Sequence, residues 1–169
     1  MTEAASETLQ LTPSESVTIR SHTSDALVVE ATYGAGGKPP PKHYHPGQDE
    51  HFEVLEGSIR VRVDGDEREL GGGETIDIPR NVVHQMWNPG DVPARVSWET
   101  RPAGRTAEWF RALDRAVRER PPGKDVPPLP VLAALLSEYR DVIRPAGPDV
   151  VLRPALGLLG KISRTRSDG

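Results

Sequence analysis

The sequence predicts an all-β sandwich or barrel of antiparallel strands, followed by a C-terminal α-helical extension. Short stretches of alternating apolar and polar residues, separated by turn residues roughly every 8–12 positions, are typical of this class. No helical pattern separates these stretches, which argues against a parallel sheet built from strand–helix–strand units. The 16 glycines and 17 prolines among 169 residues also favour a turn-rich β architecture.

We expect three regions along the chain. Residues 1–14 are predicted to form an N-terminal arm or a first strand, residues 15–101 a β-barrel domain, and residues 102–169 a helical extension. The length fits one domain, and no internal repeat indicates a second barrel.

The clearest strand pattern covers residues 58–63, where Ile59 and Val61 alternate with Arg60 and Arg62. Asp64-Gly65 follows and indicates a two-residue hairpin, because both turn positions of that hairpin need positive φ. We expect the two arginines on the outside of the barrel; the opposite orientation would favour an acidic substrate. Further strands are predicted over residues 16–20, 26–33, 75–78, 82–87 and 94–100.

Three helices are expected in the extension, over residues 106–120, 130–143 and 150–162. Thr106 is a candidate N-cap for the first of these helices. The apolar residues of that helix share one face, and they are Trp109, Phe110, Leu113, Ala116 and Val117. Trp109 and Phe110 are expected either to cover the barrel or to form a dimer contact.

Composition and charge exclude several classes of protein. There is no cysteine, so disulfides and thiolate ligands are excluded. The polar, acidic residues 1–15 lead us to expect no signal peptide. No apolar run approaches the ~20 residues of a membrane span, and we expect a cytoplasmic protein. Residues 101–120 carry six basic and three acidic side chains, but their helical alternation indicates a solvent-exposed face and no nucleic-acid partner.

Four residues could form a metal site. Residues two apart in a strand point the same way, so His43 and His45 present both imidazoles on one face. Glu50 follows a four-residue turn and begins a returning strand, which can bring its carboxylate beside them. His84 lies in another apolar strand that a barrel can bring across. His51 is expected on the opposite face from Glu50.

The spacing of these residues resembles the two cupin motifs. The first motif is matched by His43-x-His45-x4-Glu50-x6-Gly57, and the second by Gly73-x5-Pro79-x-Asn81-x2-His84-x3-Asn88. Asn81 stands where the family has glycine, and asparagine tolerates the positive φ of such a turn. The resemblance implies a conical antiparallel barrel, a homodimer, and one metal inside held by His43, His45, Glu50 and His84. It also implies structural turn positions at Gly57, Gly73, Pro79 and Asn88.

Three imidazoles and a carboxylate suit one divalent ion of Fe, Mn, Ni, Cu or Zn, with coordination positions left open for a substrate. We therefore expect a metal-dependent enzyme acting on a small hydrophobic or aromatic molecule, with oxygenase chemistry ahead of isomerisation or cyclisation. Glu50 is a candidate general base. The alternative is a non-catalytic cupin that binds or senses a small ligand.

The pocket candidates follow from alternation around the ligands. Six residues are expected to point inward, and each of them fits an ordinary core position equally well: Phe52, Val54, Ile76, Ile78, Met86 and Trp98. Trp98 is alternatively expected to face the helical extension. The apolar lining favours a hydrophobic small-molecule substrate as the partner.

Overall fold

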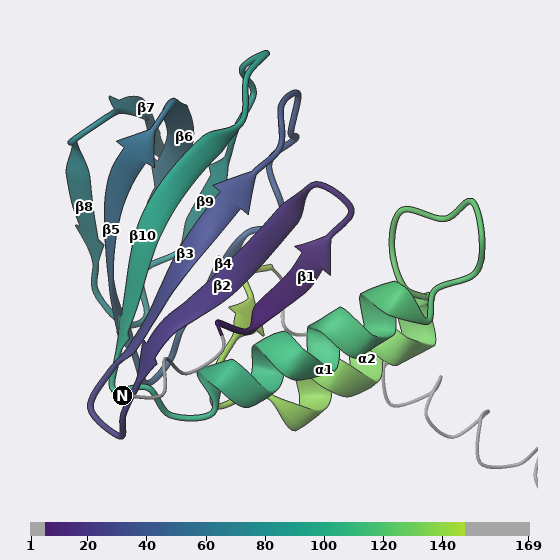
Figure 1. Ribbon diagram of the computed structural model, residues 1–169. Coiled ribbons are helices and arrows are strands. Elements are labelled where there is room, and N and C mark those ends of the chain that lie inside the picture. The colour runs from purple at the N-terminus through teal and green to yellow at the C-terminus, as the bar shows by residue number, and fades with distance from the viewer. Residues whose placement is uncertain (1–5, 148–169) are drawn as a thin grey trace, which may run out of the picture.

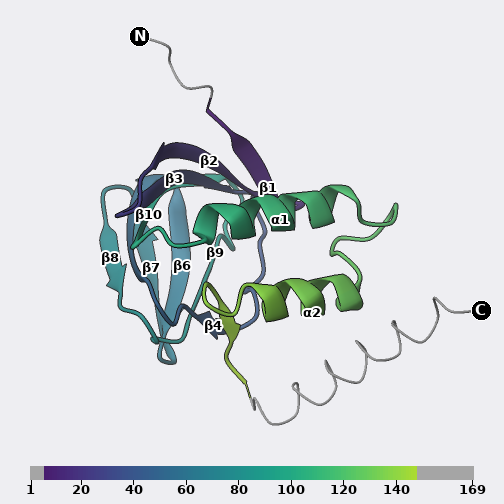
Figure 2. The same cartoon turned by 90° about the horizontal axis from the view of Figure 1, so that it is seen from below.

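The computed structural model describes residues 6–147, which form two antiparallel β-sheets facing each other, with two helices alongside (Figures 1 and 2). One sheet has the strand order β1-β2-β3-β10-β5-β8. Its strands are β1 (Thr8–Thr12), β2 (Glu15–His22), β3 (Leu27–Tyr33), β5 (Asp49–Glu56), β8 (Thr75–Ile78) and β10 (Ala94–Arg101). The other sheet has the order β11-β4-β9-β6-β7. Its strands are β4 (His43–Tyr44), β6 (Ser58–Val63), β7 (Asp66–Gly71), β9 (His84–Trp87) and β11 (Arg144–Pro145).

The antiparallel β domain with a helical extension is confirmed, but closure of the sheets into a barrel is not. Between residues 6 and 147, no strand pairing joins one sheet to the other. The edge strand β1 instead packs against helix α1 (Thr106–Arg118), which lies along the side where the sheets separate (Figure 2). This part of the chain is therefore a jelly-roll-like pair of sheets with one side covered by a helix.

The alternation in β6 produces the predicted inner and outer faces. Ile59 and Val61 are 0% exposed. Arg62 lies on the outer face, where its guanidinium covers the ring of Trp87 at 5.3 Å and donates to Gln85 at 3.0 Å. The orientation that would have favoured an acidic substrate is therefore wrong.

Two predicted turns have the expected backbone. Asp64 and Gly65 have φ values of 48° and 95°, as the two-residue hairpin requires. Asn81 has a φ of 67°, so it takes the left-handed conformation in which the related motif has glycine.

Inward-facing side chains of both sheets form the core. The largest fully buried ones are aliphatic apart from Phe110, and each stabilises the fold by roughly 1.5–3 kcal/mol relative to exposure. They are Leu27, Ile59, Leu70, Ile78, Val17, Val29, Val54, Val61, Val96, Phe110, Val117 and Val142.

The first helix differs from expectation at its start. Thr106 is its first helical residue and Arg105 occupies the N-cap position, so the N-cap assigned to Thr106 is wrong. The Thr106 hydroxyl instead accepts a hydrogen bond from Gln48. Trp109 and Phe110 are 8% and 2% exposed, so they pack within the chain and are not available as a dimer contact.

The second helix, α2 (Leu129–Glu138), is shorter than predicted. The residues that follow it turn back and pair as β11 with β4. The third expected helix, over residues 150–162, lies outside the described residues. Between residues 6 and 147, no helix is both long and apolar enough to cross a membrane.

Candidate metal centre

Three histidine side chains converge between the sheets. His43 begins β4 and His45 follows two positions later, so strand alternation directs both imidazoles to the same side. His84 begins β9 and is the cross-strand partner of His43. One ring nitrogen from each of the three lies within 4.8 Å of the others.

The fourth predicted ligand, Glu50, reaches these histidines from β5 in the opposite sheet. Its Oε1 lies 3.3 Å from Nε2 of His45, and its Oε2 lies 3.2 Å from Nε2 of His84. Trp98 on the neighbouring strand β10 donates from Nε1 to the Glu50 Oε1 at 3.0 Å. Glu50 is 2% exposed, so its carboxylate is held by protein groups and not by bulk water.

Each imidazole is oriented by a backbone carbonyl next to its Nδ1 atom. The acceptors are Pro41 for His43 at 3.0 Å, Val142 for His45 at 2.7 Å, and Val82 for His84 at 3.0 Å. A neutral imidazole that donates from Nδ1 carries its lone pair on Nε2. This pattern fixes the tautomer and the ring direction in the way that outer partners of metal ligands do.

The protonation states also suit a cation. Burial, together with the neighbouring His84 and His45, lowers the pKa of His43 to about 4, so its imidazole is neutral near pH 7. Burial opposes ionisation of Glu50, but the adjacent His45 and His84 outweigh it and lower the pKa of Glu50. Burial also disfavours charge on His84, yet the adjacent Glu50 carboxylate raises the pKa of His84. A carboxylate facing imidazoles is thus the charge pattern that a divalent ion stabilises.

Two buried atoms of this cluster have no hydrogen-bond partner among residues 6–147, namely Nε2 of His45 and Oε2 of Glu50. An unpaired buried polar atom costs about 1–3 kcal/mol. Both atoms are of the kinds that coordinate a divalent metal ion, and nitrogen and carboxylate donors suit the borderline transition metals. The residues therefore fit a mononuclear metal centre.

The predicted pocket residues lie mostly in the buried core. Five of them are buried, namely Phe52, Val54, Ile76, Ile78 and Met86. The sixth, Trp98, stacks on Phe52 with ring centroids 5.3 Å apart and meets Phe110 of α1 edge-on at 5.1 Å. Trp98 therefore faces both the Glu50 carboxylate and the helical extension. Contact of these residues with a substrate stays a prediction.

No sequence pattern indicated that residues after α2 take part in the site. The Val142 carbonyl orients His45, and Pro145 of β11 lies opposite His43 in the strand pairing. The Ala146 N–H donates to the Lys42 carbonyl at 2.8 Å and extends this pairing. Backbone groups make these contacts, so no residue type could have indicated them.

Gln48 also escaped prediction. It is 3% exposed, and its side-chain nitrogen donates to the Ala103 carbonyl at 3.1 Å as well as to the Thr106 hydroxyl. These bonds tie the turn that precedes Glu50 to the start of α1. A buried glutamine within a polar turn has no distinguishing sequence signal.

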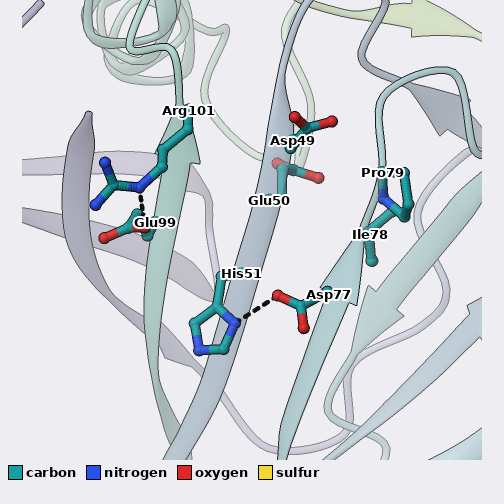
Figure 3. Close-up of a pocket in the computed structure, with 8 residues that line it drawn as sticks. All are labelled: Asp49, Glu50, His51, Asp77, Ile78, Pro79, Glu99 and Arg101. Atoms are coloured by element: carbon teal, nitrogen blue, oxygen red, sulfur yellow. Dashed lines mark hydrogen bonds and ion pairs between the residues drawn. The ribbon is translucent and has the colours of Figure 1, made fainter. Parts of the chain in front are cut away.

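An open depression of about 650 Å³ lies on the outer side of β5, β8 and β10 (Figure 3). His51 lines it and contacts Asp77 at 2.7 Å, while Arg101 pairs with Glu99 beside them. His51 thus points away from the interior, as alternation predicted. Its partner Asp77 has a side chain that is 80% exposed, so this surface lacks the burial of the histidine cluster.

Comparison with known proteins agrees with the motif spacing. A sequence model of the family described as "Cupin domain" matches residues 29–98. The chain is 40% identical over 68 residues to the tetracenomycin polyketide synthase protein TcmJ of Streptomyces glaucescens, which covers 40% of this chain and 46% of that protein. It is 32% identical over 68 residues to quercetin 2,3-dioxygenase of Bacillus subtilis, covering 40% of this chain and 20% of that enzyme. The matched segments span less than half the length of these two relatives.

A solved structure shows the same fold. The RmlC-like cupin from Shewanella frigidimarina superposes with a TM-score of 0.55 at 19% identity, covering 61% of this chain and 89% of that chain. At this identity the likeness concerns the arrangement of strands alone.

Proposed function

The chain belongs to the cupin superfamily, and from that premise we propose that it is a metal-dependent enzyme acting on a small hydroxylated aromatic molecule, with oxygenase chemistry as the leading reaction type. One observation carries the proposal: His43, His45, His84 and Glu50 meet in a buried space, and two of their ligand atoms lack partners among residues 6–147. Buried polar atoms without a hydrogen-bond partner are uncommon in a purely structural core.

The chain's own residues have distinct roles in this proposal. The three imidazoles and the Glu50 carboxylate hold the ion, while Trp98 fixes the direction of Glu50. Helix α1 excludes water by packing Phe110 onto Trp98. A divalent ion bound there supplies Lewis acidity and, if it is redox-active, electron transfer with dioxygen.

The substrate class follows from the walls and from the relatives. Phe52 and Trp98 stack on each other, and Trp98 contacts Glu50, so aromatic surface lies next to the ligand cluster and favours an aromatic substrate. One relative is named for quercetin, a polyhydroxylated aromatic compound, and another is a polyketide synthase protein. Adjacent oxygen atoms on such a ring can chelate the ion while the ring lies against the aromatic side chains.

Glu50 is also the candidate general base for the substrate hydroxyl, because its carboxylate is ionised and lies beside the ligand nitrogens. A Glu50→Gln variant that keeps both its metal and full activity would rule out this role. Loss of activity with metal retained supports it.

The second candidate reaction is a cyclisation or isomerisation that uses the metal only as a Lewis acid. The relationship to TcmJ favours it, since that protein belongs to a polyketide synthase. Dioxygen dependence separates the two reactions, because only the oxygenase consumes it.

The test uses metal-loaded protein with quercetin as the probe, in an oxygen-electrode cell and in an anaerobic cuvette. The oxygenase proposal predicts oxygen uptake that matches quercetin loss and that disappears in a His43→Ala/His84→Ala variant. Quercetin conversion without oxygen would support the Lewis-acid reaction. Tight quercetin binding without conversion, unchanged by removal of the metal, would favour the non-catalytic binding protein.

A further inference from the structure

The ligand turn, residues 45–50, holds a buried glutamine between two of the metal ligands. His45 follows β4 and Glu50 is the second residue of β5, so only residues 46–49 lie between them. Gly47 and Asp49 are exposed, whereas the Gln48 between them is 3% exposed. Because this connection is short, whatever fixes its path also fixes where the two ligands lie.

The amide of Gln48 is anchored to the start of helix α1. Its Nε2 atom donates to the Ala103 carbonyl at 3.1 Å and to the Thr106 hydroxyl, so both of its N–H groups are used. Ala103 is 1% exposed and Thr106 is 2% exposed, so water cannot readily replace either bond. Gly104 has a φ of 50°, and a Cβ there would lie 3.1 Å from the Gln48 Nε2. The chain that leads into α1 is therefore shaped closely around this amide.

Helix α1 is a firm support for the ligand turn. Eight of its 13 residues are buried, and it packs along β1. Phe110 lies one turn after Thr106, on the same face of α1. It meets Trp98 edge-on at 5.1 Å, and Trp98 donates to Glu50. The helix thus reaches the ligand turn at two points, directly at Gln48 and through Trp98 at Glu50.

Packing alone would not favour glutamine at position 48. Among residues 6–147, the buried side-chain nitrogen and oxygen atoms without a partner are Nε2 of His45, Oε2 of Glu50 and Oε1 of Gln48. An unpaired buried oxygen carries a desolvation penalty that an apolar side chain such as leucine avoids. Leucine could not make the two bonds from Nε2, so these bonds account for the presence of Gln48.

We propose that Gln48 is a positioning residue for the metal centre. By fastening the ligand turn to the first turn of α1, it sets the separation and direction of the donor atoms of His45 and Glu50. It acts through these two ligands, as outer partners of metal ligands do. The inference rests on the metal centre of the proposed function, and it adds that the helical extension takes part in building that centre.

The test measures binding of Co²⁺, whose visible absorption changes with the geometry of its ligands. Gln48→Leu removes both anchoring bonds, Thr106→Val removes one of them, and Thr106→Ser keeps the hydroxyl. Gln10→Leu is the matched control, because Nε2 of Gln10 also donates to two groups, the carbonyls of Thr12 and Glu15, from a strand that carries no ligand. Affinity is measured by competition with a chelator, and thermal melting is recorded on the metal-free proteins.

The proposal predicts that Gln48→Leu binds Co²⁺ about 10–100-fold more weakly than wild type and with an altered spectrum. Thr106→Val should lose about threefold or more in affinity, and Thr106→Ser should restore wild-type affinity to within about twofold. Gln10→Leu should melt at a lower temperature with unchanged Co²⁺ affinity and spectrum, because its bonds serve stability alone.

Gln48→Leu with wild-type affinity and spectrum would overturn the positioning role, and so would an equal loss of affinity in Gln10→Leu. If Gln48→Leu does not fold, equal Co²⁺ affinities of Thr106→Val and Thr106→Ser would overturn it. In these cases wild type still binds Co²⁺, so the proposed function is not affected. A wild-type protein that takes up no Co²⁺ would refute the metal-dependent enzyme, and the positioning role with it.

Discussion

Replacing Trp98 by phenylalanine removes one hydrogen bond to a metal ligand and leaves the aromatic packing nearly intact. The indole Nε1 donates to Oε1 of Glu50 at 3.0 Å, and Glu50 is 2% exposed, so water cannot readily replace the lost donor. The phenylalanine ring still lies between Phe52, which stacks on Trp98, and Phe110, which meets Trp98 edge-on. The perturbation therefore acts chiefly on the direction and charge of the Glu50 carboxylate.

The size of the effect follows from the type of bond. Hydrogen bonds to charged groups contribute roughly 1.5–3 kcal/mol. That range corresponds to about 10–100-fold in an equilibrium constant, which is also the usual loss of metal affinity when an outer partner of a ligand is removed. We expect Trp98→Phe to weaken metal binding by about this factor.

The assay is competition for Zn²⁺ or Mn²⁺ with a chromophoric chelator, combined with thermal melting of the metal-free protein. Trp109→Phe is the matched control, because Trp109 also packs on an aromatic side chain, that of Tyr139, but makes no hydrogen bond to a metal ligand among residues 6–147. Metal affinity of Trp98→Phe within twofold of wild type would refute the reasoning. So would an equal loss in the Trp109→Phe control.

Two further predictions concern stability, and a third concerns metal binding. The pKa of Glu15 in the folded protein is raised from 4.5 to about 7, so the stabilising contribution of its protonated form is present below pH 4.5 and is lost as the pH rises through 7. Relative to Glu15→Gln, the wild-type free energy of unfolding in urea should fall by about 1–3 kcal/mol between pH 5 and pH 8. Parallel pH profiles of the two proteins would contradict this. Gly57 has a φ of 74°, and a Cβ there would lie 2.9 Å from a backbone oxygen. Gly57→Ala should therefore lower the free energy of unfolding by about 2 kcal/mol or more. Gly72 has open space around it, so the control Gly72→Ala should lower it by less than about 1 kcal/mol. Truncation after Ile143 removes β11, which pairs with the strand that carries His43. It should therefore weaken metal binding relative to truncation after Gly147, which keeps β11. Equal metal affinities of the two truncated chains would show that β11 does not support the metal site.

Local patterns in the sequence were enough to predict most of the strands and the shared direction of the His43 and His45 side chains. Ile59 and Val61 alternate with two arginines, so burial could be read directly from residue type. The His43-x-His45 spacing places two imidazoles on one strand face, and the structure brings them beside His84. In each case the alternation of side chains along a single strand determines which side chains point inward.

The parts that could not be predicted depend on contacts between distant segments. The Val142 carbonyl bonds His45 across 97 positions, and a carbonyl has no residue signature. The N-cap of α1 was misassigned because Thr106 is engaged by Gln48, which is 58 positions away. The inward position of Glu15 could not be predicted, because a glutamate beside a turn is normally exposed. Only its pairing with Tyr33 places it among the inward-facing residues.

The most direct test of the account is the metal content of untagged protein, measured by elemental mass spectrometry beside a His43→Ala/His84→Ala variant and a His51→Ala control. His51 lies on the outer face of β5 against Asp77, so its loss leaves the ligand set intact. A four-ligand metal centre predicts close to one equivalent of a single divalent metal in wild type and in the control, and none in the double variant. A wild-type protein that is metal-free and takes up no Fe, Mn, Ni, Cu or Zn would contradict it.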